Sequence, residues 1–246
     1  MGCLQSPVWH LGLPAFLLVT ATSVGFANGT SGSVAKRTLI VSSVDVSGGK
    51  PDADQVKALQ AISDNAVKTG SRYYSRIISL LGAGKHPQAE KVTISFTYAY
   101  KGVAATGGDH MEVANDYALK RPNDIPGVIV HELAHVVQAY SKDTGYDTGW
   151  LTEGIADYVR WFNFEPKAKR PHPQLKRNPK ATGSYQTTGA FLFWTVGKYD
   201  RNLVKKLNEA MYDGSYTPGI WKKLTGKTLE ELNTEWVSTL SEPNKP

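Results

Sequence analysis

The feature that most constrains how this chain can fold is the stretch VIVHELAHVVQAY, residues 128–140. Two histidines and a glutamate stand in it among valine, isoleucine, leucine and alanine, so the predicted helix is apolar over most of its circumference. A helix of that kind is buried, and burying an imidazole or a carboxylate without a polar partner costs free energy. The fold must therefore bring partners to His131, Glu132 and His135 from other parts of the chain.

The spacing of the two histidines suits a single metal ion. His131 and His135 lie four residues apart, so a helix projects both imidazoles from one face, as one zinc ion requires. Glu132 is rotated by about a third of a turn, from where it can reach a metal-activated water instead of the metal. The alternative is one more buried helix that carries two histidines without a metal.

A third ligand is offered by the next predicted helix, GWLTEGIADYVR, residues 149–160. A catalytic zinc ion usually has three protein ligands and one position for water. Glu153 lies 18 residues after His135, and Asp157 follows four residues later on the same helix face. Glu153 can be the third ligand, and Asp157 can accept a hydrogen bond from the free ring nitrogen of a ligand histidine. By themselves the two carboxylates would indicate a solvated helix face; beside the histidine pair they indicate a zinc site.

These motifs resemble those of the gluzincin peptidases, in which Glu-x-x-x-Asp on the following helix supplies the third zinc ligand and its supporting aspartate. Together with GSYQTTGAFLFW, residues 183–194, they resemble the plant basic secretory proteins and their bacterial and fungal relatives, a family of secreted zinc peptidases of plants and bacteria. The resemblance covers roughly residues 37–240 and is most specific between Val128 and Arg160. It implies a zincin-like fold, secretion, and the defence role often proposed for the plant members.

The order of the predicted elements indicates the α+β class. Alternating β-branched residues predict strands over 37–46 and 91–100. A turn region is expected at 101–109, followed by a short edge strand that begins at His110. Between the first two strands, residues 51–70 predict a helix that ends at a glycine, with a second helix or a kinked extension behind it.

Helices dominate the remainder of the chain. Asp124 can cap the helix of the two histidines, Pro126 suits its first turn, and Ser141 is its expected end. Helical periodicity also covers four later segments, 149–162, 184–199, 201–212 and 229–240. We therefore expect a zincin-like α+β fold. Its N-terminal lobe holds a small mixed sheet and the His-Glu-x-x-His helix, its C-terminal lobe is mainly helical, and the active-site cleft lies between them.

The chain is expected to divide into three parts. Residues 1–27 contain no Lys, Arg, Asp or Glu and carry an apolar stretch that is short for a membrane span of about 20 residues, so they predict a secretory signal peptide. Residues 28–36 predict a flexible leader. Residues 37–246 predict a single zincin-like metallopeptidase domain with lobes at about 37–145 and 146–246.

Lipidation is the alternative for the N-terminus, because Gly2 and Ser6 fit a myristoylation pattern and Cys3 could be palmitoylated. The apolar run directly behind that pattern favours the signal peptide and hence secretion. Cys3 is the only cysteine, so the expected mature protein has no disulfide and no cysteine ligand. It is also expected to have no transmembrane segment.

The chain is basic, with a formal net charge of +6. Such a charge favours contact with anionic cell-wall or surface polymers, although it also serves solubility alone. The clearest basic run, Pro166–Lys180, contains prolines that predict a surface loop. It has no interleaved aromatic residues, so no nucleic-acid partner is expected.

Taken together, these patterns predict a secreted endopeptidase that depends on Zn²⁺ and hydrolyses peptides or proteins through a zinc-activated water. The predicted roles are metal ligands for His131, His135 and Glu153, support of a ligand for Asp157, general base for Glu132, and oxyanion donor for Tyr185. A packing role is the alternative for Tyr185. Two other functions compete: a catalytically weak secreted zinc-binding protein that binds cell-wall or other anionic partners, and a hydrolase of a non-protein amide.

Overall fold

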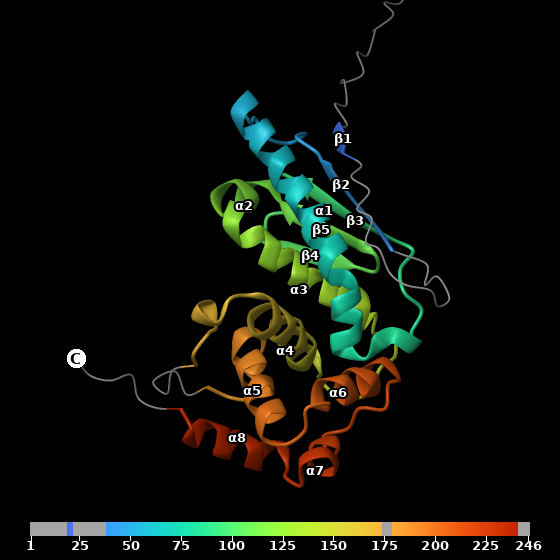
Figure 1. Ribbon diagram of the computed structural model, residues 1–246, viewed down its shortest axis with the longest axis vertical. Coiled ribbons are helices and arrows are strands. Elements are labelled where there is room, and N and C mark those ends of the chain that lie inside the picture. Colours follow the sequence, from blue (N-terminus) through green and yellow to red (C-terminus); the bar gives the residue numbers. More distant parts are fainter. Residues whose placement is uncertain (1–18, 22–37, 174–178, 241–246) are drawn as a thin grey trace, which may run out of the picture.

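Figure 1 shows the computed structural model, which describes residues 19–21, 38–173 and 179–240. The predicted signal peptide, residues 1–27, lies outside these ranges apart from 19–21, and the predicted leader, residues 28–36, lies outside them altogether. One sheet and a larger number of helical segments make up the described part, which confirms the predicted α+β class. Within it, no helix is both long enough and apolar enough to cross a membrane.

The sheet lies at one end of the molecule and the later helices lie at the other (Figure 1). The strands are β1 Val19–Ala21, β2 Leu39–Val44, β3 Lys91–Thr97, β4 Ala104–Gly107 and β5 His110–Ala114. The α-helices are α1 Ala53–Leu81, α2 Asn115–Lys120, α3 Ile125–Gln138, α4 Gly149–Val159, α5 Tyr185–Lys198, α6 Leu203–Tyr212, α7 Ile220–Thr225 and α8 Leu229–Ser238. Short 3-10 turns occur at Ala83–Lys85, Pro122–Asp124 and Lys167–Lys169, and a π-helical turn, Arg160–Phe164, continues α4.

The sheet is mixed, with the strand order β1-β2-β3-β5-β4. β2, β3 and β5 are parallel, whereas β1 and β4 run antiparallel to their neighbours at the two edges. Every second residue of the central strands is buried, as the β-branched alternation predicts. Helix α1 packs against β2 and β3, and α3 packs against both α1 and β4, so the helix of the two histidines is covered from several sides.

The outer strand next to α3 is β4, which corrects the sequence prediction. Residues 101–109 were expected to form a turn and His110 to begin an edge strand, but β5 lies inside the sheet, between β3 and β4. Residues 104–107 read Ala-Ala-Thr-Gly and have little intrinsic strand propensity. Antiparallel pairing with β5, in which Thr106 lies opposite Met111, stabilises this strand instead.

The first long helix also differs from its prediction. α1 does not end at Gly70 but continues through it, and the whole helix is 29 residues long. A Cβ atom at Gly70 would lie 3.0 Å from Cδ1 of Ile40 and 3.5 Å from Cδ1 of Leu133, so this glycine permits close packing of α1 against β2 and α3. The helix ends instead at Gly82, whose φ of 69° is the left-handed conformation common at helix ends. Gly70 is therefore a packing residue and not the helix end that the sequence predicts.

A buried amide links the sheet end of the molecule to the helical end. Asn208 of α6 is fully buried, and its Nδ2 donates to the carbonyl oxygen of Leu81, the last residue of α1, at 3.1 Å. Its Oδ1 accepts from the hydroxyl of Tyr140, just after α3, at 2.7 Å. An unsatisfied buried polar group costs about 1–3 kcal/mol. The amide of Asn208 therefore fixes α1, α3 and α6 relative to one another.

Helices α4 and α5 approach each other closely through two glycines. A Cβ atom at Gly154 would lie 2.1 Å from Cγ2 of Thr188, and one at Gly189 would lie 3.1 Å from the backbone nitrogen of Tyr158. Thr188 cannot easily yield, because it is buried and its hydroxyl donates to the carbonyl oxygen of Ala181 at 2.8 Å. This contact fixes α4 against the start of α5, where Tyr185 lies.

Gly154→Ala is predicted to lower the free energy of unfolding by about 1–3 kcal/mol, because the added methyl group overpacks the α4–α5 contact. Urea unfolding monitored by circular dichroism measures the change. Gly197→Ala is the matched control: Gly197 also lies in a helix, but a Cβ atom there meets nothing within 4 Å. It should leave stability unchanged or raise it, since alanine is the better helix former. Equal stability of wild type and Gly154→Ala would contradict the close contact.

Candidate metal centre and cleft

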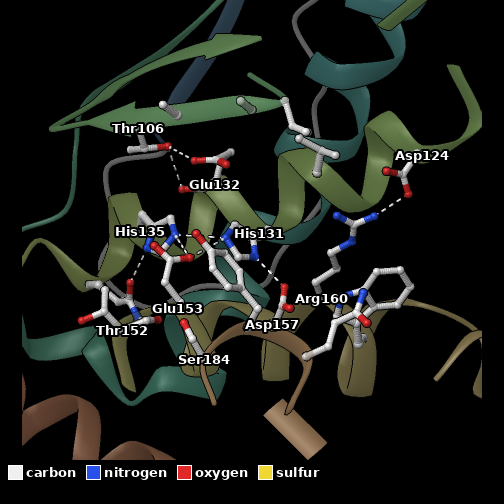
Figure 2. Close-up of a pocket in the computed structure, with 18 of the residues that line it drawn as sticks. Thr106, Asp124, His131, Glu132, His135, Thr152, Glu153, Asp157, Arg160 and Ser184 are labelled. Atoms are coloured by element: carbon white, nitrogen blue, oxygen red, sulfur yellow. Dashed lines mark hydrogen bonds and ion pairs between the residues drawn. The ribbon is translucent and has the colours of Figure 1, made fainter. Parts of the chain in front are cut away.

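Three of the side chains singled out from the sequence meet at one point (Figure 2). The Nε2 atoms of His131 and His135, both on α3, lie 3.1 Å apart. Oε2 of Glu153, on α4, lies 3.2 Å from Nε2 of His131 and 3.5 Å from Nε2 of His135. Among the residues that the structure describes, no other group of three or more His, Cys, Asp or Glu side chains has ligand atoms this close together.

The opposite ring nitrogens are held by acceptors. Nδ1 of His131 lies 2.7 Å from Oδ1 of Asp157, and Nδ1 of His135 lies 2.7 Å from Oε1 of Gln138. The amide of Gln138 is itself oriented, because its Nε2 donates to the carbonyl oxygen of Thr152 at 3.0 Å. Both Nδ1 atoms therefore donate to these acceptors, and the two Nε2 atoms, which face each other and Glu153, are the ones left to bind a cation.

This donor set fits a zinc ion. Three lone pairs at 3.1–3.5 Å from one another repel unless a cation lies between them. In a tetrahedral zinc site with bonds of about 2.0–2.1 Å, neighbouring ligand atoms are about 3.3–3.4 Å apart. Two imidazoles and one carboxylate are also a common ligand set of catalytic zinc. His131, His135 and Glu153 are thus the residues that could hold the metal.

The electrostatics of the site favour positive charge. Burial lowers the pKa of His131, but hydrogen bonds to Asp157 and Glu153 outweigh that effect and raise the pKa to about 9. Burial likewise raises the pKa of Glu153, but its hydrogen bonds with the two histidines outweigh it and lower the pKa to about 2. The carboxylates thus stabilise a cation at the imidazoles, whether it arrives as a proton or as a metal ion.

Glu132 lies beside the ligands and is held by a residue that the sequence analysis missed. The hydroxyl of Thr106 donates to Oε2 of Glu132 at 2.7 Å and also lies 3.3 Å from the carbonyl oxygen of the same residue. Thr106 belongs to β4, so the contact bridges the outer strand and α3 (Figure 2). It was missed because residues 101–109 had been interpreted as a turn. Gln138 was also missed, although its position three residues after His135 is one from which helix side chains meet.

Tyr185 lies at the rim of the site. Its ring is 6.3 Å from the ring of His131 and nearly parallel to it, and the side chain is 55% exposed. Ser184 and Tyr185 have φ values of 64° and 45°, and such left-handed conformations of non-glycine residues cluster at functional sites. The charge of Glu153 raises the pKa of Tyr185 above its usual value, so the hydroxyl keeps its proton at neutral pH.

A cleft of about 1700 Å³ contains these groups and runs along α3. β4 forms one wall, and α4 together with the first residues of α5 forms the other; Figure 2 labels Thr106 on the first wall and Ser184 on the second. Pockets for single small ligands are usually about 300–1,000 Å³. The cleft is therefore large enough for a segment of a polymer.

One end of the cleft is shaped by Arg160, the first residue of the π-helical turn. Arg160 pairs with Asp124 and lies over the ring of Trp161 at 4.3 Å. Asp124 also accepts from the hydroxyl of Tyr117 at 2.5 Å. Asp124 is the N-cap residue of α3, as predicted, but its carboxylate makes no capping bond to the helix, because Tyr117 and Arg160 bind it instead.

Among the comparisons with known proteins, the match to a protein family is the informative one. The family described as "Peptidase of plants and bacteria" matches residues 43–236. No curated protein matches the chain.

Similar solved structures include an M1 zinc metallopeptidase from Deinococcus radiodurans, at 14% identity and a TM-score of 0.47, over 92% of this chain and 53% of that one. Two further similar structures are substituted enzymes: a two-domain M1 zinc metallopeptidase bound to L-arginine, and an M1 zinc metallopeptidase from Deinococcus radiodurans bound to a Tyr-Ser-Ala substrate. Each is 13% identical to this chain, with a TM-score of 0.45 over 85% of this chain and 50% of its own. The chain thus spans about half the length of these structures. Because the family match extends over well more than half of the sequence, the chain belongs to the peptidase family of plants and bacteria.

Proposed function

We propose that the protein is a secreted, zinc-dependent endopeptidase with a zincin-like fold. The observation that carries the proposal is the convergence of lone pairs from His131, His135 and Glu153, at 3.1–3.5 Å from one another in a cleft. Membership of a peptidase family supports it. In this proposal the sheet with α1–α3 forms one lobe, the helices from α4 onward form the other, and the cleft between them takes the substrate.

The chain supplies the proton transfer that peptide hydrolysis needs. When bound, zinc supplies Lewis-acid polarisation of the substrate carbonyl and lowers the pKa of a water to about 7. Glu132 takes a proton from the attacking water and returns it to the leaving amine. Thr106 holds Oε2 of Glu132 and leaves Oε1 to take that proton. Asp157 and Gln138 keep the rings of the two histidines in the tautomer that leaves Nε2 free for the metal.

The walls of the cleft suit an extended peptide. β4 is the outer strand of the sheet, so the backbone of a peptide can add to its free edge by β-pairing. Tyr185 stands at the rim of the opposite wall. We propose that its neutral hydroxyl donates to the oxyanion that forms when the carbonyl is attacked.

Glu153→Ala is predicted to lower zinc occupancy well below one ion per chain, because one of three ligands is lost. Asp157→Ala should weaken zinc affinity about 10–100-fold, as the loss of partners of ligand histidines does. Elemental analysis and competition with a chelator measure both effects. Glu209→Ala is the control, since Glu209 is exposed on α6. A full equivalent of tightly bound zinc in Glu153→Ala would exclude Glu153 as a ligand.

Glu132→Gln keeps the size of the side chain and removes the base, so zinc content should be unchanged while hydrolysis falls by at least about 10²–10⁴-fold. The measurement is kcat/KM on a broad peptide library, with chelator and with zinc restored. Hydrolysis at the wild-type rate by Glu132→Gln would contradict the mechanism. A zinc-loaded wild type that cleaves no peptide would favour the zinc-binding protein without turnover.

Thr106→Val, which removes the hydroxyl at nearly constant shape, should lower kcat about 10-fold and leave KM nearly unchanged, because a hydrogen bond to a charged group is lost. Thr106→Ser restores the hydroxyl and should recover most of kcat. Steady-state kinetics of the two variants distinguish an effect on Glu132, which changes kcat, from an effect on substrate binding, which changes KM. A raised KM with normal kcat would show that Thr106 acts on the substrate and not on Glu132.

Residues 1–27 are predicted to be absent from the secreted protein, which intact-mass measurement checks. Their removal takes away β1, which pairs with β2 through three residues only, and leaves β2 as the edge of a four-stranded sheet. The chain that begins at Asn28 should therefore unfold at the same temperature as the full chain. A mass that includes Gly2 with a fatty acyl group would support lipidation instead.

A further inference from the structure

The cleft is charged unevenly along its length. Its middle holds the acidic groups of the site, and the end beyond the C-terminus of α3 is lined by Gln138, Ala139, Tyr140 and Ser141, which carry no formal charge. The opposite end, at the N-terminus of α3, has a single acid, Asp124. Four cations line that end and together are called the cationic arm: Lys120, Arg121, Arg160 and Lys169.

Two cations of the arm are engaged within the protein. Arg160 is buried, pairs with Asp124 and stacks over Trp161. Lys169 Nζ lies 3.2 Å from Oε2 of Glu165, which is itself buried. These contacts fix one wall of the arm and neutralise the charges of Arg160 and Lys169.

The other two cations are available to a ligand. Lys120 lies in the last turn of α2 and Arg121 directly follows that helix; both are exposed. Neither forms an ion pair within residues 38–173 and 179–240. The unpaired positive charge at this end of the cleft is therefore concentrated on these two adjacent side chains. A guanidinium can hold a carboxylate with two parallel hydrogen bonds, which an ammonium reinforces as a point charge.

The arm lies within reach of a peptide bound at the metal site. Asp124, the partner of Arg160 in the arm, precedes His131 by seven positions, so at about 1.5 Å per residue this part of the arm lies roughly 10 Å from the histidine along α3. An extended peptide advances about 3.3 Å per residue and covers that distance in roughly three residues. We propose that the cationic arm binds an acidic side chain of the peptide substrate, about three residues from the bond that is cleaved. This inference rests on the peptidase function proposed above and names the class of substrate.

A peptide is the favoured occupant because the arm and the metal site line one continuous cleft. An acidic group bound there also neutralises Lys120 and Arg121, with which no residue of the described chain forms an ion pair. The competing occupant is an anionic polysaccharide, which would need the charge but not the rest of the cleft.

The test uses peptides that differ only in one charge. A fluorogenic peptide carries Gln or Glu in turn at each of the four positions on either side of the cleaved bond. At one position, on one side, kcat/KM for the Glu peptide should exceed that for its Gln counterpart roughly 5-fold, as expected for a pair of solvent-exposed ion pairs. Added salt should reduce this preference, because exposed charges are screened.

The decisive variant is Lys120→Glu/Arg121→Glu in the full chain, for which the Glu-to-Gln ratio of kcat/KM should fall below one. The matched control is Lys222→Glu/Lys223→Glu. Those two lysines are also exposed and adjacent, and they lie in the last turn of a six-residue helix as Lys120 does, but they lie outside the cleft. The control changes the net charge by the same amount and should keep the preference of the wild type. Thermal unfolding of both variants checks that each is folded.

Binding to the Glu132→Gln protein separates this inference from the proposed function. If the wild type cleaves no peptide, the peptidase proposal fails, while fluorescence anisotropy of the Glu and Gln peptides still reports on the arm. Equal kcat/KM, or equal affinity in the anisotropy measurement, for the Glu and Gln peptides at every position would overturn the inference. A preference for Glu that survives in Lys120→Glu/Arg121→Glu would overturn it as well. Binding of labelled polygalacturonate that requires Lys120 and Arg121, with no discrimination between the peptides, would assign the arm to a polysaccharide and overturn it too.

Discussion

The contact on which the rest of the structure depends is the approach of two imidazole nitrogens, Nε2 of His131 and of His135, to 3.1 Å inside a buried helix. Their lone pairs can face each other only if acceptors hold the opposite ring nitrogens and a cation lies between them. Asp157 and Gln138 provide the acceptors, and Glu153 provides the negative charge that stabilises the cation. Because two of these three residues come from α4, the polar partners that His131 and His135 need determine where α4 packs against α3.

Glycines allow that packing. Gly154 lets α4 lie directly against α5, and Gly127 on α3 leaves room for the side chains of Arg160 and Glu165, whose atoms would lie 2.8 Å and 2.4 Å from a Cβ there. α4 is thus in contact with one helix that carries His131 and His135 and another that begins with Tyr185. The site and the helical half of the molecule are in this way parts of one packing arrangement.

What the sequence could predict follows from local periodicity. His131, His135, Glu153 and Asp157 were found because helical spacing places residues four apart on one face, and the structure brings these side chains together. Thr106, by contrast, lies on a strand that exists only through pairing with β5, and the partners of Asp124 lie on other elements, so no local pattern identifies either. Gly70 shows the same limit. A glycine is needed there because of close packing against Ile40, which lies 30 positions away in the chain.

The buried amide of Asn208 has a consequence for what can enter the cleft. It ties the end of α1, the chain just after α3 and α6 together, so α3, along which the cleft runs, is anchored to the helical end of the molecule. A cleft that is held in this way does not close around its substrate, so the substrate must already fit it. Under the proposed function, a segment of a target protein therefore has to detach from its own fold before it can enter. The turnover of a compact target is then governed by how often that target opens locally, and less by how well its sequence suits the cleft.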